Sequence, residues 1–143
     1  AIPKISKLWE LNIRTYVEVN GIKGVYFFTL ETDSKLGELI ARSFFHLPYR
    51  HSKIKANVGK DFYEFDHSRE KFHFNLKAQI LKKRQPTEFD LWATERYSLF
   101  TKNGSKTYQG IVEHSPWPLR DVNLSQIGNN FTTMVTCLLY TSD

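Results

Sequence analysis

Hydrophobic and polar residues alternate strictly from Trp9 to Val19. One face of this segment carries Trp9, Leu11, Ile13, Val17 and Val19, and the other carries Glu10, Asn12, Arg14, Tyr16 and Glu18. A period of two predicts a β-strand. The polar face combines an acid, an amide, a cation and a phenol, which suits the lining of a polar cavity. The alternative is an exposed face of an antiparallel sheet with a cross-strand ion pair.

Further segments show strand patterns separated by turn residues. Asn20-Gly21 and Lys23-Gly24 predict a hairpin into a strand over 25–30, and Asn103-Gly104 predicts a second hairpin. The remaining predicted strands cover 52–58, 61–66, 71–81, 96–102, 106–114 and 131–140. The segment 67–70 is expected to be a polar turn, and 121–130 is expected to be polar and rich in turns.

One clear helix is predicted between these strands. Apolar residues recur at spacings of three and four from Leu36 to Leu47, after a cap at Asp33 or Ser34, and Pro48 ends the segment. A shorter helical turn is expected over 88–94, with Thr87 as its cap and Asp90 three residues later.

The composition favours a single sheet-rich domain over residues 1–143. Aromatic residues make up 15% of the chain, which favours strands, and 41% hydrophobic residues suffice for a core at this length. The one cysteine, Cys137, excludes an internal disulfide and lies in an apolar run, where a thiol is a small buried hydrophobe. The sequence contains neither an apolar run long enough for a membrane span nor a secretory signal, so a cytoplasmic location is expected.

The net charge of +5 gives only a weak argument for nucleic-acid binding. The excess lysines are dispersed over 53–60 and 77–84, and the aromatic residues alternate onto the apolar faces of the strands. Glycine-rich phosphate loops, nucleophile elbows and metalloprotease motifs are absent, and the five histidines are widely spaced. No metal and no cofactor are therefore predicted.

Five sequence blocks carry a family resemblance. They begin at Glu10 (ELNIRTYV), Gly24 (GVYF), Leu47 (LPY), Glu95 (ERY) and His114 (HSPWPL). In this order they resemble the uncharacterised YqjF-like family, which is itself similar to acetoacetate decarboxylase. The resemblance implies a closed or nearly closed antiparallel β-barrel with a polar cavity. Family members carry more chain before the first block, so this chain is expected to correspond to the C-terminal portion, with a barrel open on one side or completed by a second copy.

The resemblance also raises the question of a Schiff-base lysine. In the decarboxylase, two adjacent lysines follow a helix and a proline, and one of them forms the imine. Here Pro48 is followed by Tyr49 and Arg50, neither of which can form an imine. Lys53 lies nearby, but its strand position is equally consistent with solvation. We therefore expect no Schiff-base decarboxylation.

The polar residues in the resembling blocks are the candidate site. Glu10 and His114 are candidates for proton transfer, and the candidate ligand-binding residues are Asn12, Arg14, Tyr16, Tyr49, His51, Arg96, Tyr97 and Trp117. At least two of Asn12, Arg14 and Tyr16 are expected to share a cavity with Tyr97 or His114. Alternatively, Glu10 and Arg14 belong to a satisfied structural network, and Trp117 plugs one end of the core.

These residues favour a small-molecule-binding barrel, either a binding protein or an enzyme, whose ligand is an organic acid or a carbonyl compound. The alternative is a non-enzymatic structural or interaction module, with homo-oligomer formation through unpaired strand edges.

Overall fold

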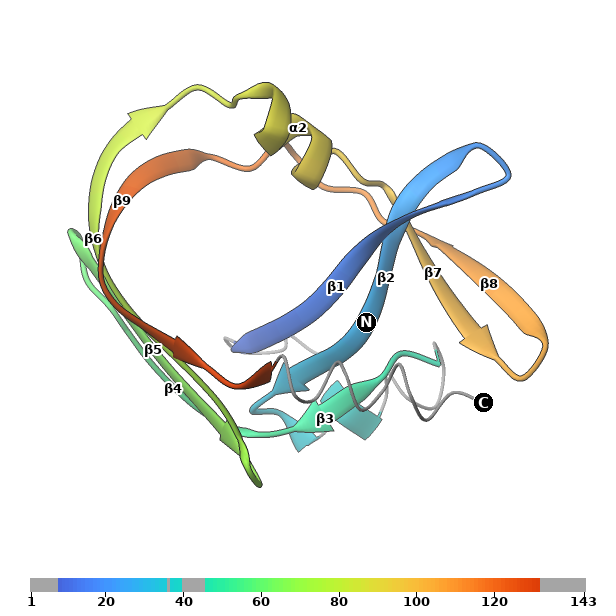
Figure 1. Ribbon diagram of the computed structural model, residues 1–143, viewed down its shortest axis with the longest axis horizontal. Helices are drawn as coiled ribbons and strands as arrows, with labels where there is room; N and C mark the ends of the chain where they lie inside the picture. The colour runs from blue at the N-terminus through green and yellow to red at the C-terminus, as the bar shows by residue number, and fades with distance from the viewer. Residues whose placement is uncertain (1–7, 36, 40–45, 132–143) are drawn as a thin grey trace, which may run out of the picture.

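The computed structural model describes residues 8–35, 37–39 and 46–131. Its strands are β1 (Glu10–Val19), β2 (Ile22–Thr32), β3 (Tyr49–His51), β4 (Lys53–Val58), β5 (Phe62–Arg69), β6 (Phe72–Arg84), β7 (Ser98–Asn103), β8 (Lys106–Ile111) and β9 (Leu119–Asn129). The helix α2 (Glu88–Thr94) connects β6 to β7. Viewed down the shortest axis, these elements are arranged as an open ring with α2 at the top and β7–β8 projecting to the right (Figure 1).

The first sheet has five strands in the order β1-β2-β7-β8, and β3 also pairs with β2. The predicted hairpin between β1 and β2 is confirmed, because Asn20 and Gly21 adopt the positive φ angles of 51° and 78° that a tight turn requires. β2 pairs in parallel with both β3 and β7. The expectation of a wholly antiparallel sheet is therefore wrong at these two places.

The second sheet has four antiparallel strands in the order β4-β5-β6-β9. Its strand β9 occupies the segment that was expected to be polar and turn-rich. The pairing register changes from Lys77↔Gln126 to Ala78↔Leu124, which leaves Ser125 as a bulge between paired residues. Because a bulge interrupts the period of two, Leu124 and Ile127 are three residues apart and the strand pattern was hidden.

Both helix predictions can be compared with the structure. Residues 35 and 37–39 are helical, and residues 36 and 40–45 of the predicted helix lie outside the described residues. Residues 46 and 47 are described and are not helical, so the expected extension of the helix to Leu47 is wrong. α2 is confirmed as predicted: Thr87 accepts from the Asp90 backbone N–H, and the Asp90 side chain accepts from the Thr87 N–H.

The closed or nearly closed barrel implied by the resemblance is not seen among the described residues, which form two open sheets. β1 pairs only with β2, and β9 pairs only with β6, so both strands keep a free edge within the described ranges. The predicted strand over 131–140 lies outside these ranges except for Phe131, which is buried against Phe72.

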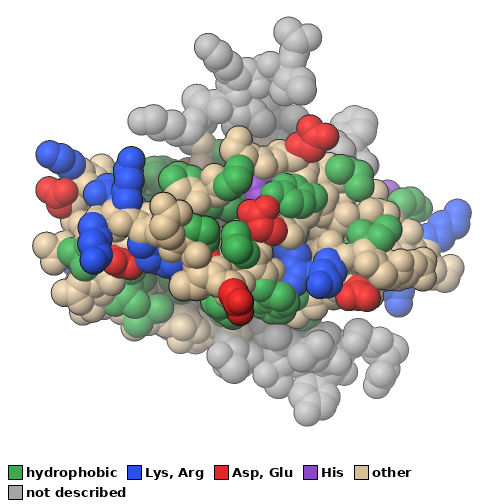
Figure 2. Space-filling view, turned by 90° about the horizontal axis from the view of Figure 1, so that it is seen from above, with side chains coloured by type: hydrophobic (Ala, Val, Ile, Leu, Met, Phe, Trp, Pro, Cys, Tyr) green, Lys and Arg blue, Asp and Glu red, His purple; other side chains and the backbone are tan. Residues whose placement is uncertain are grey.

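The surface on the α2 side mixes side chains of all kinds. Seen from above, hydrophobic side chains are exposed among interspersed cationic and anionic ones (Figure 2). No helix within the described residues is long and apolar enough to cross a membrane.

Candidate functional site

The first group of predicted site residues surrounds Glu10 at the start of β1. The Tyr49 hydroxyl donates to Glu10 Oε2 at 2.8 Å, and Asn12 Nδ2 lies 3.4 Å from Glu10 Oε1. Burial raises the pKa of the Tyr49 hydroxyl, and the adjacent Glu10 carboxylate raises it further. His51 is half-buried on the same face of β3 as Tyr49, two residues further along. This group holds a neutral phenol against a carboxylate.

The second group joins β1 to α2 and contains both predicted arginines. The Tyr16 ring lies 4.3 Å from the Trp92 ring, centroid to centroid. The guanidinium of Arg96 lies 5.3 Å from the centroid of Tyr16 and 4.9 Å from that of Trp92, and the guanidinium of Arg14 lies 5.7 Å from that of Tyr16. Two cations therefore face one aromatic ring.

The hydrogen bonds of these two arginines go to backbone carbonyls. Arg96 Nε donates to the Trp92 carbonyl at 2.8 Å, and Arg14 Nη2 lies 3.4 Å from the Ala93 carbonyl. Neither guanidinium forms an ion pair with a carboxylate of the described residues. Donors remain on both planar cations, as an anion site requires.

α2 determines where Trp92 lies. Arg84 on β6 donates to both carboxylate oxygens of Asp90, at 2.5 and 2.9 Å, and Arg84 Nε lies 3.4 Å from Asp121 on β9. The N-terminal turn of α2 is thus attached to the second sheet, while Trp92 contacts the first sheet at Tyr16. The helix bridges the two sheets, although none of its residues is buried.

The third group is a stack of three rings that come from the last two of the five sequence blocks. Tyr97 and His114 stack with centroids 4.9 Å apart, and Trp117 lies 5.5 Å from His114. The Tyr97 hydroxyl donates to Glu95, and this hydrogen bond raises the pKa of Tyr97. Trp117 is 60% exposed, so it does not plug the core of the described residues.

The tautomer of His114 follows from its partner. His114 Nδ1 lies 2.9 Å from the Ser115 carbonyl, which can only accept, so Nδ1 carries the hydrogen. In the neutral ring, Nε2 then keeps its lone pair as an acceptor. The ten predicted residues are thus divided among three groups, and the single cavity expected to join Asn12, Arg14 or Tyr16 to Tyr97 or His114 stays a prediction.

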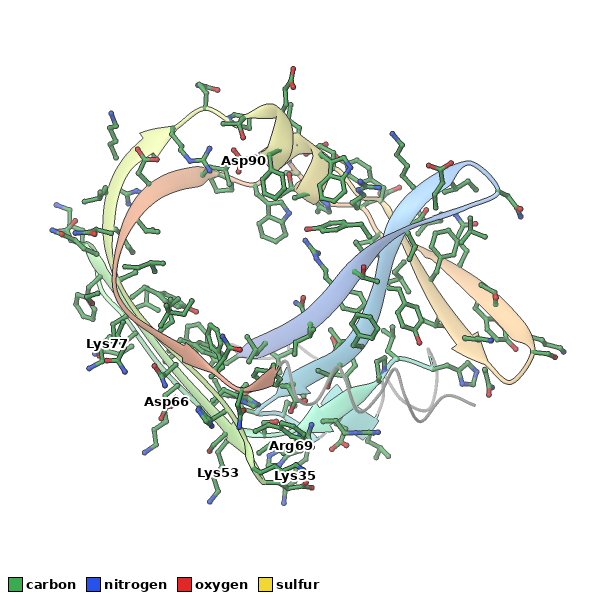
Figure 3. All side chains as sticks on the ribbon, viewed as in Figure 1. Lys35, Lys53, Asp66, Arg69, Lys77 and Asp90 are labelled. Atoms are coloured by element: carbon green, nitrogen blue, oxygen red, sulfur yellow. The ribbon has the colours of Figure 1, made fainter. Side chains whose placement is uncertain are left out.

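A buried cluster around Glu31 was missed by the sequence reasoning. Glu31, at the end of β2, has no exposed surface, and Arg69 on β5 donates to both of its carboxylate oxygens, at 2.7 and 2.9 Å. Thr29 Oγ1 donates to Glu31 at 2.6 Å, and the Ser52 hydroxyl also donates to it. Arg69 lies at the lower end of the second sheet, beside β3 (Figure 3). The cluster therefore connects the two sheets.

His67 completes this cluster and is fully buried. Its Nε2 lies 3.3 Å from Glu31 Oε2, while its Nδ1 has no hydrogen-bond partner in the part of the chain that the structure describes. Burial alone would raise the pKa of Glu31, but hydrogen bonds from His67, Arg69, Ser52 and Thr29 outweigh burial and hold this pKa well below its usual range. The expectation of a polar turn over 67–70 is wrong, since β5 continues to Arg69 and carries both side chains inward.

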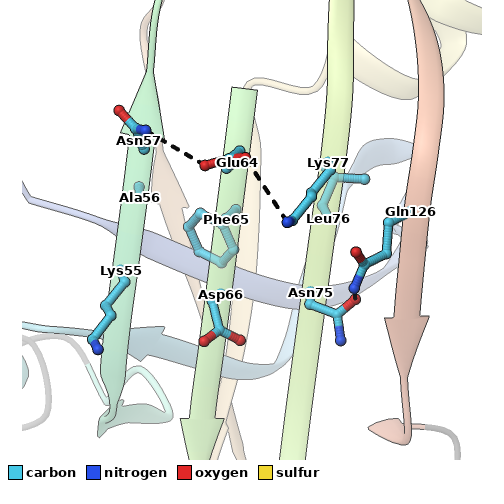
Figure 4. A pocket seen from close by; sticks show the side chains of 10 residues that line it. All are labelled: Lys55, Ala56, Asn57, Glu64, Phe65, Asp66, Asn75, Leu76, Lys77 and Gln126. Carbon is cyan, nitrogen blue, oxygen red and sulfur yellow. Dashed lines mark hydrogen bonds and ion pairs between the residues drawn. The ribbon is translucent and has the colours of Figure 1, made fainter. Parts of the chain in front are cut away.

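A groove of about 390 Å³ lies across the four-stranded sheet (Figure 4). Its polar side chains largely contact one another: Gln126 donates to Asn75 at 3.0 Å, and Lys77 lies 3.9 Å from Glu64. This pairing is typical of a solvated sheet face. Within the described ranges, no three His, Cys, Asp or Glu side chains form a group that could hold a metal ion.

Comparison with known proteins identifies the family. The model of DUF2071, described as an uncharacterized conserved protein (COG2071), matches residues 1–137. The chain belongs to the DUF2071 family. It is 35% identical over 140 residues to the uncharacterized protein YqjF of Bacillus subtilis (strain 168), an alignment that covers 92% of this chain and 57% of YqjF. The chain thus spans little more than half the length of that relative. No solved structure matches.

In this DUF2071 chain, the lysine nearest to the expected imine position is exposed. Lys53 is the first residue of β4, where it pairs with Ser68. Tyr49 and Arg50 occupy the positions directly after Pro48 on β3. Lys53 is therefore not in the buried environment that a Schiff-base lysine needs.

Proposed function

We propose that this protein binds a small anionic ligand, an organic acid or a carbonyl compound, in an acetoacetate decarboxylase-like β-barrel. The observation that carries the proposal is the pair of guanidiniums, Arg14 and Arg96, on the Tyr16 ring, without a carboxylate partner among the described residues. A ligand carboxylate would supply the missing negative charge.

The chemistry of the pair suits a planar anion. A guanidinium presents parallel N–H donors that match the two oxygens of a carboxylate, and such charge-assisted bonds are roughly twice as strong as neutral ones. The Tyr16 ring faces both cations and the Trp92 ring faces Arg96, so each guanidinium has an aromatic neighbour. A ligand that carries its carboxylate here would place its remaining atoms against these rings.

The candidates for proton transfer on such a ligand are Glu10 and His114, which belong to the other two groups. Glu10 accepts a hydrogen bond from the Tyr49 hydroxyl and His114 offers Nε2 as an acceptor, so each would act on a ligand that extends to it from the arginine pair. Any reaction proposed for this site is therefore acid–base chemistry, because imine formation needs a lysine with a lowered pKa.

The test is a thermal-shift screen of small keto, hydroxy and dicarboxylic acids. A ligand at 100 times its Kd stabilises the native state by about 2.7 kcal/mol, and the midpoint of unfolding rises accordingly. We expect Arg14→Gln and Arg96→Gln to abolish the shift. The matched control is Arg50→Gln, since Arg50 is exposed and its guanidinium donates to the backbone carbonyl of the preceding residue, Tyr49. Equal shifts in all three variants, or no shift with any acid, would contradict the proposal.

A second candidate is an interaction module, including self-association. β9 pairs only with β6 within the described chain, and its Val122, Leu124 and Ile127 are 51%, 50% and 58% exposed. An edge strand with exposed apolar side chains favours pairing with another chain. Sedimentation velocity measures this association directly.

A further inference from the structure

We propose that a separate pocket, between the segment 46–47 and the β7–β8 hairpin, binds a neutral, mainly apolar small molecule with one hydrogen-bonding group. The pocket has a volume of about 470 Å³, within the range of small-molecule sites. It shares no lining residue with the Arg14–Arg96 pair, so it does not depend on the function proposed above.

The floor of the pocket is one face of the hairpin that projects in Figure 1. Leu99 and Thr101 share this face because they are two residues apart on β7, and their antiparallel partners are Gly110 and Tyr108. A Cβ atom at Gly110 would lie 3.1 Å from Leu99 Cγ, so only glycine leaves this part of the floor clear. The hairpin thus forms a concave apolar surface.

Thr101 provides the observation that indicates a ligand. Thr101 is 5% exposed, it lines the pocket, and its hydroxyl has no hydrogen-bond partner among the described residues. A buried hydroxyl without a partner is unfavourable, and native proteins rarely retain one. Rotation about χ1 moves the hydroxyl between staggered positions, so that a ligand oxygen in the pocket could become its partner.

The rim of the pocket is also apolar. Ile111, Tyr108 and Val112 are 69%, 42% and 38% exposed, and a bound molecule would remove part of this surface from water. The His46 ring lies 5.5 Å from that of Tyr108. His46 has a φ of 51°, a left-handed conformation that residues other than glycine adopt rarely and that occurs at ligand clamps.

The lining residues determine the charge of the ligand. None of the nine lining residues within the described part of the chain is Lys, Arg, Asp or Glu, which favours a neutral ligand. A smaller cavity of about 100 Å³ shares His46, Leu47 and Thr101 with it. Thr101 therefore lines both cavities. This position fits a ring or branched chain in the larger cavity, with its polar group at Thr101.

The experiment compares benzyl alcohol with toluene as probes, by ¹H–¹⁵N NMR titration of the full chain. We expect saturable shifts at residues 46–47, 99–101 and 108–112, with roughly two- to tenfold tighter binding of benzyl alcohol. Thr101→Val should remove this preference without lowering the midpoint of thermal unfolding, since it deletes the unpartnered hydroxyl. A preference retained by Thr101→Val would overturn the role of the hydroxyl.

A second variant tests the pocket from an exposed position. Ile111→Trp should fill the pocket at the β7–β8 hairpin and abolish binding of both probes. Ile22→Trp, at a position 43% exposed on β2, should bind them like the wild type. Binding that survives Ile111→Trp, or the absence of saturable shifts in the wild type, would overturn the proposal. Arg96→Gln should leave probe binding unchanged, which separates this site from the anion site.

Discussion

At the scale of single residues, the fully buried carboxylate of Glu31 connects the two sheets. Glu31 accepts hydrogen bonds from Arg69, Ser52 and Thr29, which come from both sheets and from the junction between β3 and β4. Replacing such a network by apolar residues can be neutral, but removing one charged member leaves its partner buried and unpaired. A substitution of Glu31 should therefore reduce the stability of the fold more than a substitution of an exposed acidic residue.

Glu31→Gln should lower the free energy of unfolding by about 3–5 kcal/mol, because Arg69 then loses the buried carboxylate to which it donates two hydrogen bonds. Urea denaturation followed by circular dichroism measures this loss. Glu18→Gln, on the exposed face of β1, is the matched control and should change stability by less than about 0.5 kcal/mol. A loss in Glu31→Gln no larger than in this control would show that the cluster is energetically neutral.

The pH dependence of stability has a defined sign at this residue. The pKa of Glu31 is lower in the folded chain than its ordinary value of about 4.5, so the unfolded chain binds the proton more readily. The stability from Glu31 is fully present above about pH 4.5 and falls as the pH decreases below it. The stability difference between the wild type and Glu31→Gln should therefore narrow in acid. A constant difference from pH 7 to pH 3 would contradict this.

At the scale of elements, the features that depend on neighbouring residues were predictable from the sequence, whereas contacts between distant segments were not. The β1–β2 turn at Asn20-Gly21 and the capping box of α2 were predicted because each depends on adjacent residues. β9 was missed because its bulge at Ser125 interrupts the alternation. Arg14 and Tyr16 were assigned correctly to one strand face, but their contact with Trp92 could not be predicted, since it depends on how Arg84 and Asp90 position α2.

Asp90→Asn should loosen α2 without unfolding the sheets. The substitution removes the charge that Arg84 contacts and weakens the cap at Thr87, so Trp92 should become more accessible to iodide quenching and anion affinity should fall. Glu88→Gln, in the same helical turn, is the control and should retain wild-type quenching.

The hydrogen bonds from Arg84 and Thr87 lower the pKa of Asp90, so wild-type quenching should stay constant as the pH falls through 3.8, the ordinary aspartate value. Unchanged quenching in Asp90→Asn would show that the ion pair does not position Trp92.

At the scale of the whole molecule, two links join sheets that are otherwise open. One is the Glu31 cluster and the other is α2, while β1 and β9 keep free edges within the described residues. The chain covers 57% of the length of YqjF. An apolar edge such as β9 is normally covered by further chain, by a second copy or by another protein.

If β9 is the surface of self-association, a charge on its apolar face should weaken the association while the same charge on its other face should not. Leu124 is 50% exposed and Asn123 is exposed beside it, and consecutive strand residues point to opposite faces. Leu124→Lys should weaken association at least about tenfold, since burying a leucine contributes roughly 1.5–3 kcal/mol and an unpaired ammonium opposes burial. Asn123→Lys carries the same charge and is the control. Sedimentation velocity over a concentration series distinguishes the variants. A wild-type chain that stays monomeric throughout the series would contradict self-association. Equal weakening by both substitutions would show that the apolar face of β9 does not mediate it.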